Sequence, residues 1–243
     1  RFVEEVGAEA QARGLRFLVG RCYETSRGDP YVPVVEVLEA VQRRLSPEAF
    51  RDIIGEHAGE IARLLPNLRR QYPDIPPPAE LPGDEERRYP FVTAQEVLAR
   101  VGAGRPVVIL VDDLQWADEP SLLLLEYLAT KLRELPILIA TTYTSEEVSA
   151  SSPLHEMLTK LPRRHLVQSV VVDELNEADV ALLLTAIGES PPPPALVQNL
   201  YQATRGNPFF LEEVVHQLVE QGRLFADGRW REAAQRLSAA LSA

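Results

Sequence analysis

Two adjacent carboxylates, Asp112 and Asp113, are the residues of this 243-residue chain whose position best suits chemistry. They directly follow Val107 to Val111, five consecutive apolar residues that predict a strand buried on both faces of a parallel sheet. Open α/β sheets bind their ligands at the carboxyl ends of such strands. Paired hard oxygen ligands suit Mg²⁺, which keeps most of its waters and takes one or two carboxylates together with substrate phosphates.

The same pair has a plainer interpretation as ordinary turn chemistry. Acidic residues after strands often close a strand-to-helix turn or are simply solvated, as Asp112 and Asp113 would then be. The longer string DDLQWAD, residues 112–118, favours a functional interpretation, because a string of this length is rarely matched by chance. Asp118 also suits the N-cap of a following helix, which has Pro120 in its first turn.

Metal-dependent hydrolysis is a second chemistry open to these carboxylates. It would use a cluster of Asp112, Asp113, Asp118 and Glu119, but the sequence adds no histidine and no further acidic strand end to support it. The histidines lack the spacing of zinc ligands, so we expect no zinc site. They are His57, His155, His165 and His216.

The elements that must position the carboxylates alternate between strands and helices. Buried-strand patterns occupy Leu15 to Gly20, Val107 to Val111, Pro136 to Thr142 and Val167 to Val172. Helical patterns occupy residues 1–13, 30–45, 48–56, 59–70, the segment after Asp118, and 153–160. A further helix is expected to follow the charged turn at residues 84–88 and to run to about Val101. The proline-rich segment Tyr72 to Gly83 is expected to be a loop. Such alternation predicts a parallel α/β sheet with right-handed crossovers.

The last part of the chain changes to an all-helical pattern. Helices are expected near residues 176–187, 194–204 and 208–221, followed by a hairpin around Asp227 and Gly228. We therefore expect two domains, an α/β core at residues 1–173 and a helical lid with a partial C-terminal hairpin at residues 174–243.

The string DDLQWAD resembles the Walker B segment of the STAND P-loop ATPases, which are close relatives of AAA+ proteins. It is most similar to the ATPase modules of large bacterial regulators, of the LuxR type or fused to cyclase or kinase domains. The likeness also includes GRCYE at residues 20–24, ERRY at 86–89 and GNPFFLEE at 206–213. It implies an α/β, P-loop NTPase-like parallel sheet sandwiched by helices, followed by an all-helical lid and the start of a winged-helix-like segment.

The resemblance also implies roles for individual residues. Asp112 would be the metal residue, holding the hydration shell of Mg²⁺, and Asp113 would orient or polarise the water that attacks the γ-phosphate of ATP. Thr142 could hydrogen-bond that water, although threonines also commonly close the edge of a sheet.

A second implied element is the lid motif Gly206, Asn207 and Pro208, which would contact the adenine and report whether ATP or ADP is bound. Asn207 and Pro208 also make an ordinary helix start, with asparagine as cap and proline at the first position. The two interpretations are compatible.

A phosphate-binding P-loop, GxxxxGK[ST], is absent from the sequence. The chain has no Gly-Lys pair, and its only lysines are Lys131 and Lys160. In similar sequences the P-loop is followed at once by a segment like RFVEE, residues 1–5, so we expect an internal fragment that lacks the first strand and the P-loop. Such a fragment should bind ATP weakly and should not turn it over.

The amino-acid composition limits the classes of partner that the chain can bind directly. With 25 basic and 36 acidic residues the net charge is −11 and the pI about 5.0, which gives no footprint for direct contact with nucleic acid or an anionic membrane. The single cysteine, Cys22, excludes an internal disulfide framework. No apolar run approaches the roughly 20 residues that span a bilayer, so we expect a cytoplasmic protein.

Two functions remain open on these observations. The first is an ATP-binding and hydrolysing switch module of a multidomain bacterial signalling or transcriptional regulator. Its expected partners are nucleotide with Mg²⁺, other domains of the same polypeptide and, depending on the nucleotide, further copies of itself. The alternative is a nonenzymatic interaction platform on a degenerate ATPase fold, which the missing P-loop favours.

Overall fold

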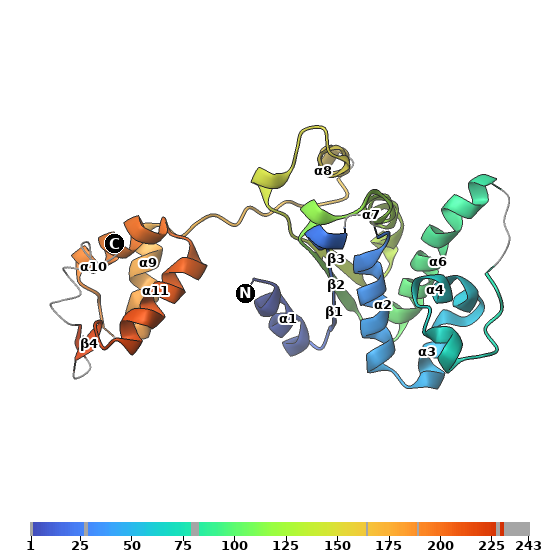
Figure 1. Cartoon of the computed structure of the whole chain (residues 1–243), viewed down its shortest axis with the longest axis horizontal. Helices are drawn as coiled ribbons and strands as arrows, with labels where there is room; N and C mark the ends of the chain where they lie inside the picture. Colours follow the sequence, from blue (N-terminus) through green and yellow to red (C-terminus); the bar gives the residue numbers. More distant parts are fainter. Residues whose placement is uncertain are drawn as a thin grey trace. The chain divides into compact units, whose positions relative to one another are not determined.

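Three parallel strands form the sheet of the computed structural model, which describes residues 2–26, 29–78, 83–163, 165–188, 190–226 and 229–230. They are β1 (Arg16–Arg21), β2 (Val107–Asp112) and β3 (Ile137–Thr141), in the order β1-β2-β3 (Figure 1). Arg16 lies opposite Val107, and Val107 lies opposite Ile137. The three strands therefore start in line, and their carboxyl ends meet at one edge of the sheet.

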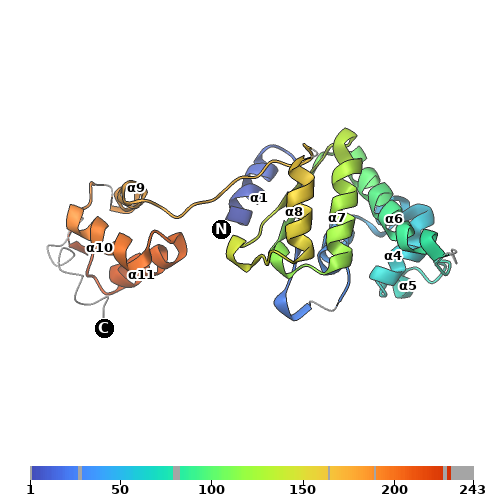
Figure 2. The same cartoon turned by 90° about the horizontal axis from the view of Figure 1, so that it is seen from above.

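Helices cover both faces of this sheet. Val108 and Leu110 of β2 face α1 (Phe2–Ala12), whereas Val107, Ile109 and Val111 belong to the larger core on the other face. That larger core contains residues of α2 (Val32–Arg44), α6 (Gly83–Ala103) and α7 (Glu119–Lys131) (Figures 1 and 2). Every residue from Val107 to Val111 is buried. The predicted α/β sandwich around a fully buried strand is confirmed.

The remaining helices of this part of the chain are α3 (Pro47–Ile54), α4 (Ala58–Leu64), α5 (Leu68–Gln71) and α8 (Pro153–Arg163). The single helix predicted at residues 59–70 is divided at residues 65–67, where Pro66 lacks the backbone N–H that a continuous helix needs. The charged turn predicted at residues 84–88 is instead part of α6. Helix α8 packs beside α7 (Figure 2). No helix of the described residues is long and apolar enough to cross a membrane.

The predicted strand at Val167 to Val172 is wrong. These residues have no regular secondary structure, and Val170, Val171 and Val172 are 80%, 77% and 71% exposed. A strand needs a neighbour to accept and donate its backbone hydrogen bonds. The β-branched residues here meet no such neighbour within the described chain, so their strand propensity is not realised.

The chain divides into two units, Arg1–Gln168 and Ser169–Ala243, and the regular elements among the described residues of the second unit are helices and a hairpin. Its helices are α9 (Glu177–Gly188), α10 (Pro194–Thr204) and α11 (Pro208–Glu220). The buried core of this unit includes Val180, Leu184, Leu196, Leu200 and Leu211.

The predicted hairpin at the end of the second unit is confirmed. Strands β4 (Phe225–Ala226) and β5 (Arg229–Trp230) pair antiparallel, and the Trp230 indole N–H donates to the Ser190 carbonyl at 3.1 Å. Asp227 and Gly228, together with the expected winged-helix-like segment after Trp230, lie outside the described residues.

Close approach of β1 to α2 requires a residue without a side chain at Gly20. A Cβ atom at this position would lie 2.1 Å from the Pro33 carbonyl oxygen, so Gly20→Ala must push the strand and the helix apart. We expect this substitution to lower the free energy of unfolding of the first unit by about 2 kcal/mol or more. Urea denaturation measures the change, with unfolding followed by Trp116 fluorescence. The measurement uses a Trp230→Phe background, which removes the tryptophan signal of the second unit.

Gly104→Ala is the matched control for this prediction. A Cβ atom at Gly104 meets nothing within 4 Å, so the same substitution there should change stability by less than about 0.5 kcal/mol. Equal effects of the two substitutions would contradict the close contact between β1 and α2.

Candidate functional site

The two candidate carboxylates lie where β2 leaves the core. Asp112 is the last residue of the strand and is half-buried, whereas Asp113 is exposed and has a left-handed backbone with φ 60° and ψ 48°. A left-handed conformation is uncommon outside glycine, although aspartate is among the residues that adopt it most readily. The turn brings the chain out of the sheet within one residue and starts the short helical turn Leu114–Trp116.

Thr142 holds both aspartates from the neighbouring strand. Its hydroxyl donates to Asp112 Oδ1 at 2.5 Å and accepts the backbone N–H of Asp113 at 3.1 Å. The Leu114 N–H donates to the Thr142 carbonyl at 2.8 Å, which continues the contact between the two chain segments. The single hydroxyl proton of Thr142 is therefore directed to Asp112, and the threonine positions the carboxylate pair.

Gln115 is a further site residue, which the sequence analysis did not single out. Its amide nitrogen donates to Asp113 Oδ1 at 3.2 Å, and its amide oxygen accepts the backbone N–H of Thr144 at 3.2 Å. The side chain thus ties Asp113 to the segment that follows β3. Its place inside the DDLQWAD string was the available signal.

Asp118 is a structural anchor of the same region. Its carboxylate accepts the backbone N–H of Ser121 at 2.8 Å, the Ser121 hydroxyl at 2.5 Å and the backbone N–H of Tyr31 at 3.2 Å. The predicted N-cap of α7 is confirmed. Three accepted hydrogen bonds occupy much of its acceptor capacity, which argues against a hydrolytic metal cluster that includes Asp118.

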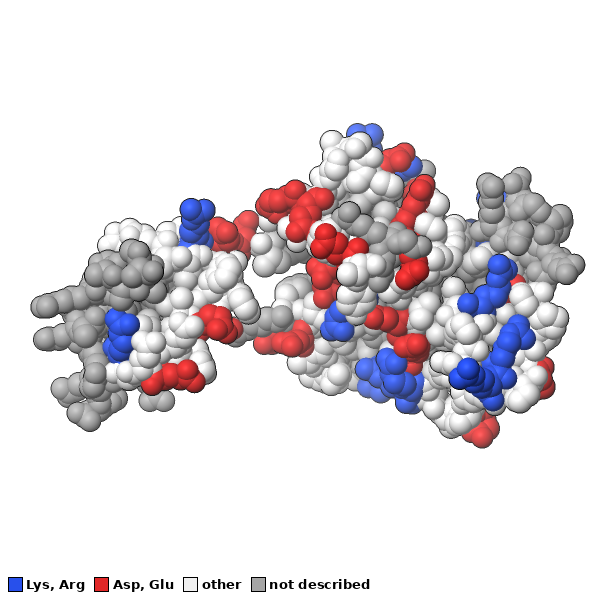
Figure 3. Space-filling view, viewed as in Figure 1, with Lys and Arg blue, Asp and Glu red and all other residues white. Residues whose placement is uncertain are grey.

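Acidic groups dominate the electrostatics of this edge of the sheet. Figure 3 shows acidic side chains gathered around the strand ends of the larger unit. Burial, and then the charges of Asp118, Asp113, Glu36 and Asp112, raise the pKa of the Cys22 thiol to about 12. Cys22 is buried, and its backbone N–H donates to the Asp112 carbonyl at 3.0 Å. The thiol stays protonated at neutral pH and cannot serve as a nucleophile.

The donor set at the strand end fits a hydrated Mg²⁺ ion. Asp112 and Asp113 offer hard oxygen ligands that solvent can reach, in a region whose charge is negative. The lysines provide no phosphate site beside them. Lys160 on α8 pairs with Glu156 at 2.8 Å, and Lys131 on α7 lies 5.9 Å from the centre of the Tyr127 ring.

The other predicted motif, Gly206 to Pro208, lies in the second unit at the start of α11. Asn207 accepts the backbone N–H of Phe209 at 3.0 Å, and Pro208 is the first helical residue, as expected for a helix start. Gly206 has φ +76°, and a Cβ atom there would lie 1.9 Å from the Leu175 carbonyl oxygen. The structure thus brings Asp112, Asp113 and Thr142 together in the first unit. The motif Gly206 to Pro208 belongs to the second unit, which is described by itself.

A second group of potential ligands surrounds His57, which has no ligand-like spacing in the sequence. His57 Nε2 lies 2.7 Å from Glu96 Oε2 and 3.7 Å from Glu56 Oε1, with all three ligand atoms within 4.8 Å of one another. Glu56 also pairs with Arg100 at 2.5 Å, which lowers the pKa of this carboxyl group. The group is therefore an ion-paired cluster between the α3–α4 connection and α6.

Comparison with known proteins identifies one family. Residues 1–140 match the family model described as the AAA ATPase domain, which is more than half of the chain. No curated protein and no solved structure matches the chain.

Substitution of Thr142 tests the bridge between the aspartates. Thr142→Val keeps the shape of the side chain but removes the donor to Asp112 and the acceptor of the Asp113 N–H. We expect the free energy of unfolding of the first unit to fall by about 1 to 2 kcal/mol, measured by urea denaturation as for Gly20.

Two further substitutions serve as controls for this prediction. Thr142→Ser retains the hydroxyl and should recover most of the loss. Thr144→Val should cost less than about 0.5 kcal/mol, because the Thr144 side chain forms no hydrogen bond within the described ranges. A loss as large in Thr144→Val as in Thr142→Val would refute the bridge.

Proposed function

The chain belongs to the AAA ATPase domain family, and we propose that it is an ATP-binding and hydrolysing switch module of a multidomain bacterial signalling or transcriptional regulator. The observation that carries this proposal is the carboxylate pair Asp112–Asp113, fixed by Thr142 at the carboxyl edge of a parallel sheet. Open α/β folds bind their ligands at this edge.

Asp112 is assigned to the metal. Its half-buried carboxylate is oriented by the Thr142 hydroxyl, so it is held ready to accept hydrogen bonds from metal-bound waters. Mg²⁺, when bound together with the triphosphate, neutralises phosphate charge that this acidic edge would otherwise repel.

Asp113 is assigned to the attacking water. Its carboxylate is exposed on the left-handed turn, and the Gln115 amide fixes one of its oxygens. An exposed carboxylate held in this way can accept a proton from a water and orient that water toward the γ-phosphate. Thr142 acts through both aspartates in this assignment and is a positioning residue.

The lid assignment rests on Gly206, Asn207 and Pro208. The left-handed Gly206 places the Leu175 backbone against this turn, with the Leu175 N–H donating to the Gly206 carbonyl at 2.9 Å. A side chain at Gly206 would block that contact, so the turn at the start of α11 can transmit a change between α11 and the segment before α9. Adenine contact at Pro208 is the proposed trigger.

The phosphates require a partner that residues 1–243 do not contain. We assign this role to a GxxxxGK[ST] loop elsewhere in the parent polypeptide, because the described lysines are engaged on α7 and α8 and no Gly-Lys pair occurs in the sequence. Other domains of that polypeptide and nucleotide-dependent self-association would then be the routes by which the switch acts.

The alternative function is a nonenzymatic interaction platform on the same fold. The absent Gly-Lys pair is the observation that favours it, since the carboxylate edge without a phosphate cradle cannot bind ATP tightly. A platform would use the fold without nucleotide turnover.

Hydrolysis by the parent polypeptide that carries residues 1–243 distinguishes these functions. Asp113→Asn should lower kcat for ATP at least about 100-fold, because the amide cannot take a proton from water, while nucleotide affinity stays within about threefold. Asp112→Asn should raise the Mg²⁺ concentration needed for half-maximal binding of a fluorescent ATP analogue. Steady-state phosphate release and equilibrium titration provide the two measurements.

Glu119→Gln is the control, because Glu119 is an exposed acidic residue next to the site, in the first turn of α7. Its rate should stay within about twofold of the native rate. An Asp113→Asn protein that hydrolyses ATP at the native rate would remove the role given to this carboxylate. A native polypeptide that neither binds nor hydrolyses ATP would establish the platform instead.

A further inference from the structure

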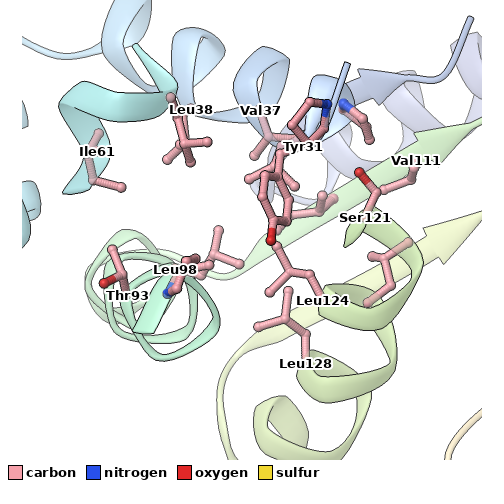
Figure 4. A pocket seen from close by; sticks show the side chains of 18 of the residues that line it. Tyr31, Val37, Leu38, Ile61, Thr93, Leu98, Val111, Ser121, Leu124 and Leu128 are labelled. Carbon is pink, nitrogen blue, oxygen red and sulfur yellow. The ribbon is translucent and has the colours of Figure 1, made fainter. Parts of the chain in front are cut away.

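A cavity of about 270 Å³ lies in the first unit between the sheet and the helices on its larger core face. Figure 4 shows its wall, which is mostly aliphatic and includes Val37 and Leu38 from α2, Leu98 from α6, and Leu124 and Leu128 from α7. An apolar cavity of roughly 150 Å³ is enough to bind benzene. The cavity therefore has room for a substituted ring.

Tyr31 extends its ring into this cavity from the start of α2, with its hydroxyl directed toward Leu124 (Figure 4). Its backbone is left-handed, with φ 66°, a conformation that costs energy for a bulky residue. The surrounding chain enforces it. The Tyr31 N–H donates to Asp118 Oδ2 at 3.2 Å, and its carbonyl accepts the N–H groups of Val34 and Val35, each at 2.9 Å.

The other polar side chains of the wall already have partners. Ser121 donates its hydroxyl to Asp118 at 2.5 Å, the Thr93 hydroxyl lies 3.5 Å from His57 Nδ1, and Glu60 lies 3.6 Å from Arg63. The Tyr31 hydroxyl, by contrast, has no hydrogen-bond partner among the residues that the structure describes. Among the polar side chains of the wall, it is the one with neither a hydrogen bond nor an ion pair to the described residues.

The state of that hydroxyl decides what it can recognise. Burial, and secondarily the charge of Asp118, raise the pKa of Tyr31 above its usual value. The hydroxyl therefore keeps its proton at neutral pH and can donate a hydrogen bond. Tyr31 is half-buried and its hydroxyl is not fully enclosed, so a ligand with an acceptor would give this donor a hydrogen bond inside the cavity in place of one to water.

We propose that this cavity binds a small, largely apolar molecule, about the size of a substituted benzene ring, that carries one uncharged hydrogen-bond acceptor. The acceptor faces the Tyr31 hydroxyl, and the ring lies among the aliphatic side chains of α2, α6 and α7. A charged ligand finds no free counter-charge here, because Glu60 and Arg63 neutralise each other. The site is distinct from the carboxylates Asp112 and Asp113 and does not depend on the function proposed for them.

Two isosteric probes test the proposal on the 243-residue chain. Acetophenone carries a carbonyl acceptor on a benzene ring, and α-methylstyrene replaces that oxygen by a methylene group of similar shape. Both should bind with dissociation constants of about 1 mM or tighter, with acetophenone the tighter of the two, in titrations followed by protein NMR. Tyr31→Phe should weaken acetophenone binding about threefold to tenfold and leave α-methylstyrene within about twofold.

A cavity-filling substitution gives a second, independent readout. Ala94 lines the cavity and is 7% exposed, so Ala94→Leu places three additional carbons in its volume. We expect it to weaken both probes at least tenfold. Ala99→Leu lies on the same helix outside the lining and should leave both affinities unchanged. Circular dichroism checks that each variant is folded. If Ala94→Leu is unfolded, the comparison of the two probes in Tyr31→Phe tests the proposal by itself.

Three results would overturn the proposal. The first is that neither probe binds at 10 mM, as expected of a cavity that takes up only water. The second is that a folded Ala94→Leu variant binds both probes with unchanged affinity. The third is that Tyr31→Phe weakens the binding of both probes equally.

Discussion

Burial of β2 on every side is the constraint on which the first unit depends. Val107 to Val111 pair with a strand on each edge and face helices on both sides of the sheet. A segment buried in this way must be apolar and must pair all of its backbone groups. Polar side chains can appear only where the burial ends, which is at Asp112. The length of the buried strand therefore sets the position of the carboxylates.

Asp118 connects that strand end to the rest of the unit. One carboxylate caps α7 through Ser121 and holds the Tyr31 backbone at the start of α2. The helix cap and the left-handed tyrosine therefore depend on the same group, which gives this acidic residue a structural role in a region already rich in negative charge. Because like charges concentrate here, the edge attracts cations and can accept a triphosphate only after its charge is offset.

The apolar pattern correctly predicted the three strands that pair with neighbouring strands. It failed for the segment that has no neighbouring strand among the described residues. The three strands of the sheet and the helices around them lie close to the ranges that periodicity indicated, and the N-cap at Asp118 was visible from its spacing to the helix. Val167 to Val172 have the same β-branched character but remain exposed without a strand. Residue type fixes how readily a segment extends, whereas strand formation requires a neighbouring edge.

The sequence by itself determined the buried strand, the carboxylate pair at its end and the family to which the chain is similar, because these depend on residue type and local spacing. The tertiary structure alone decided that Thr142 holds Asp112 from 30 residues away and that Tyr31 bonds Asp118 across 87 residues. It also decided that Tyr31 faces an aliphatic cavity. Such contacts depend on strand register and helix packing, which local pattern does not fix.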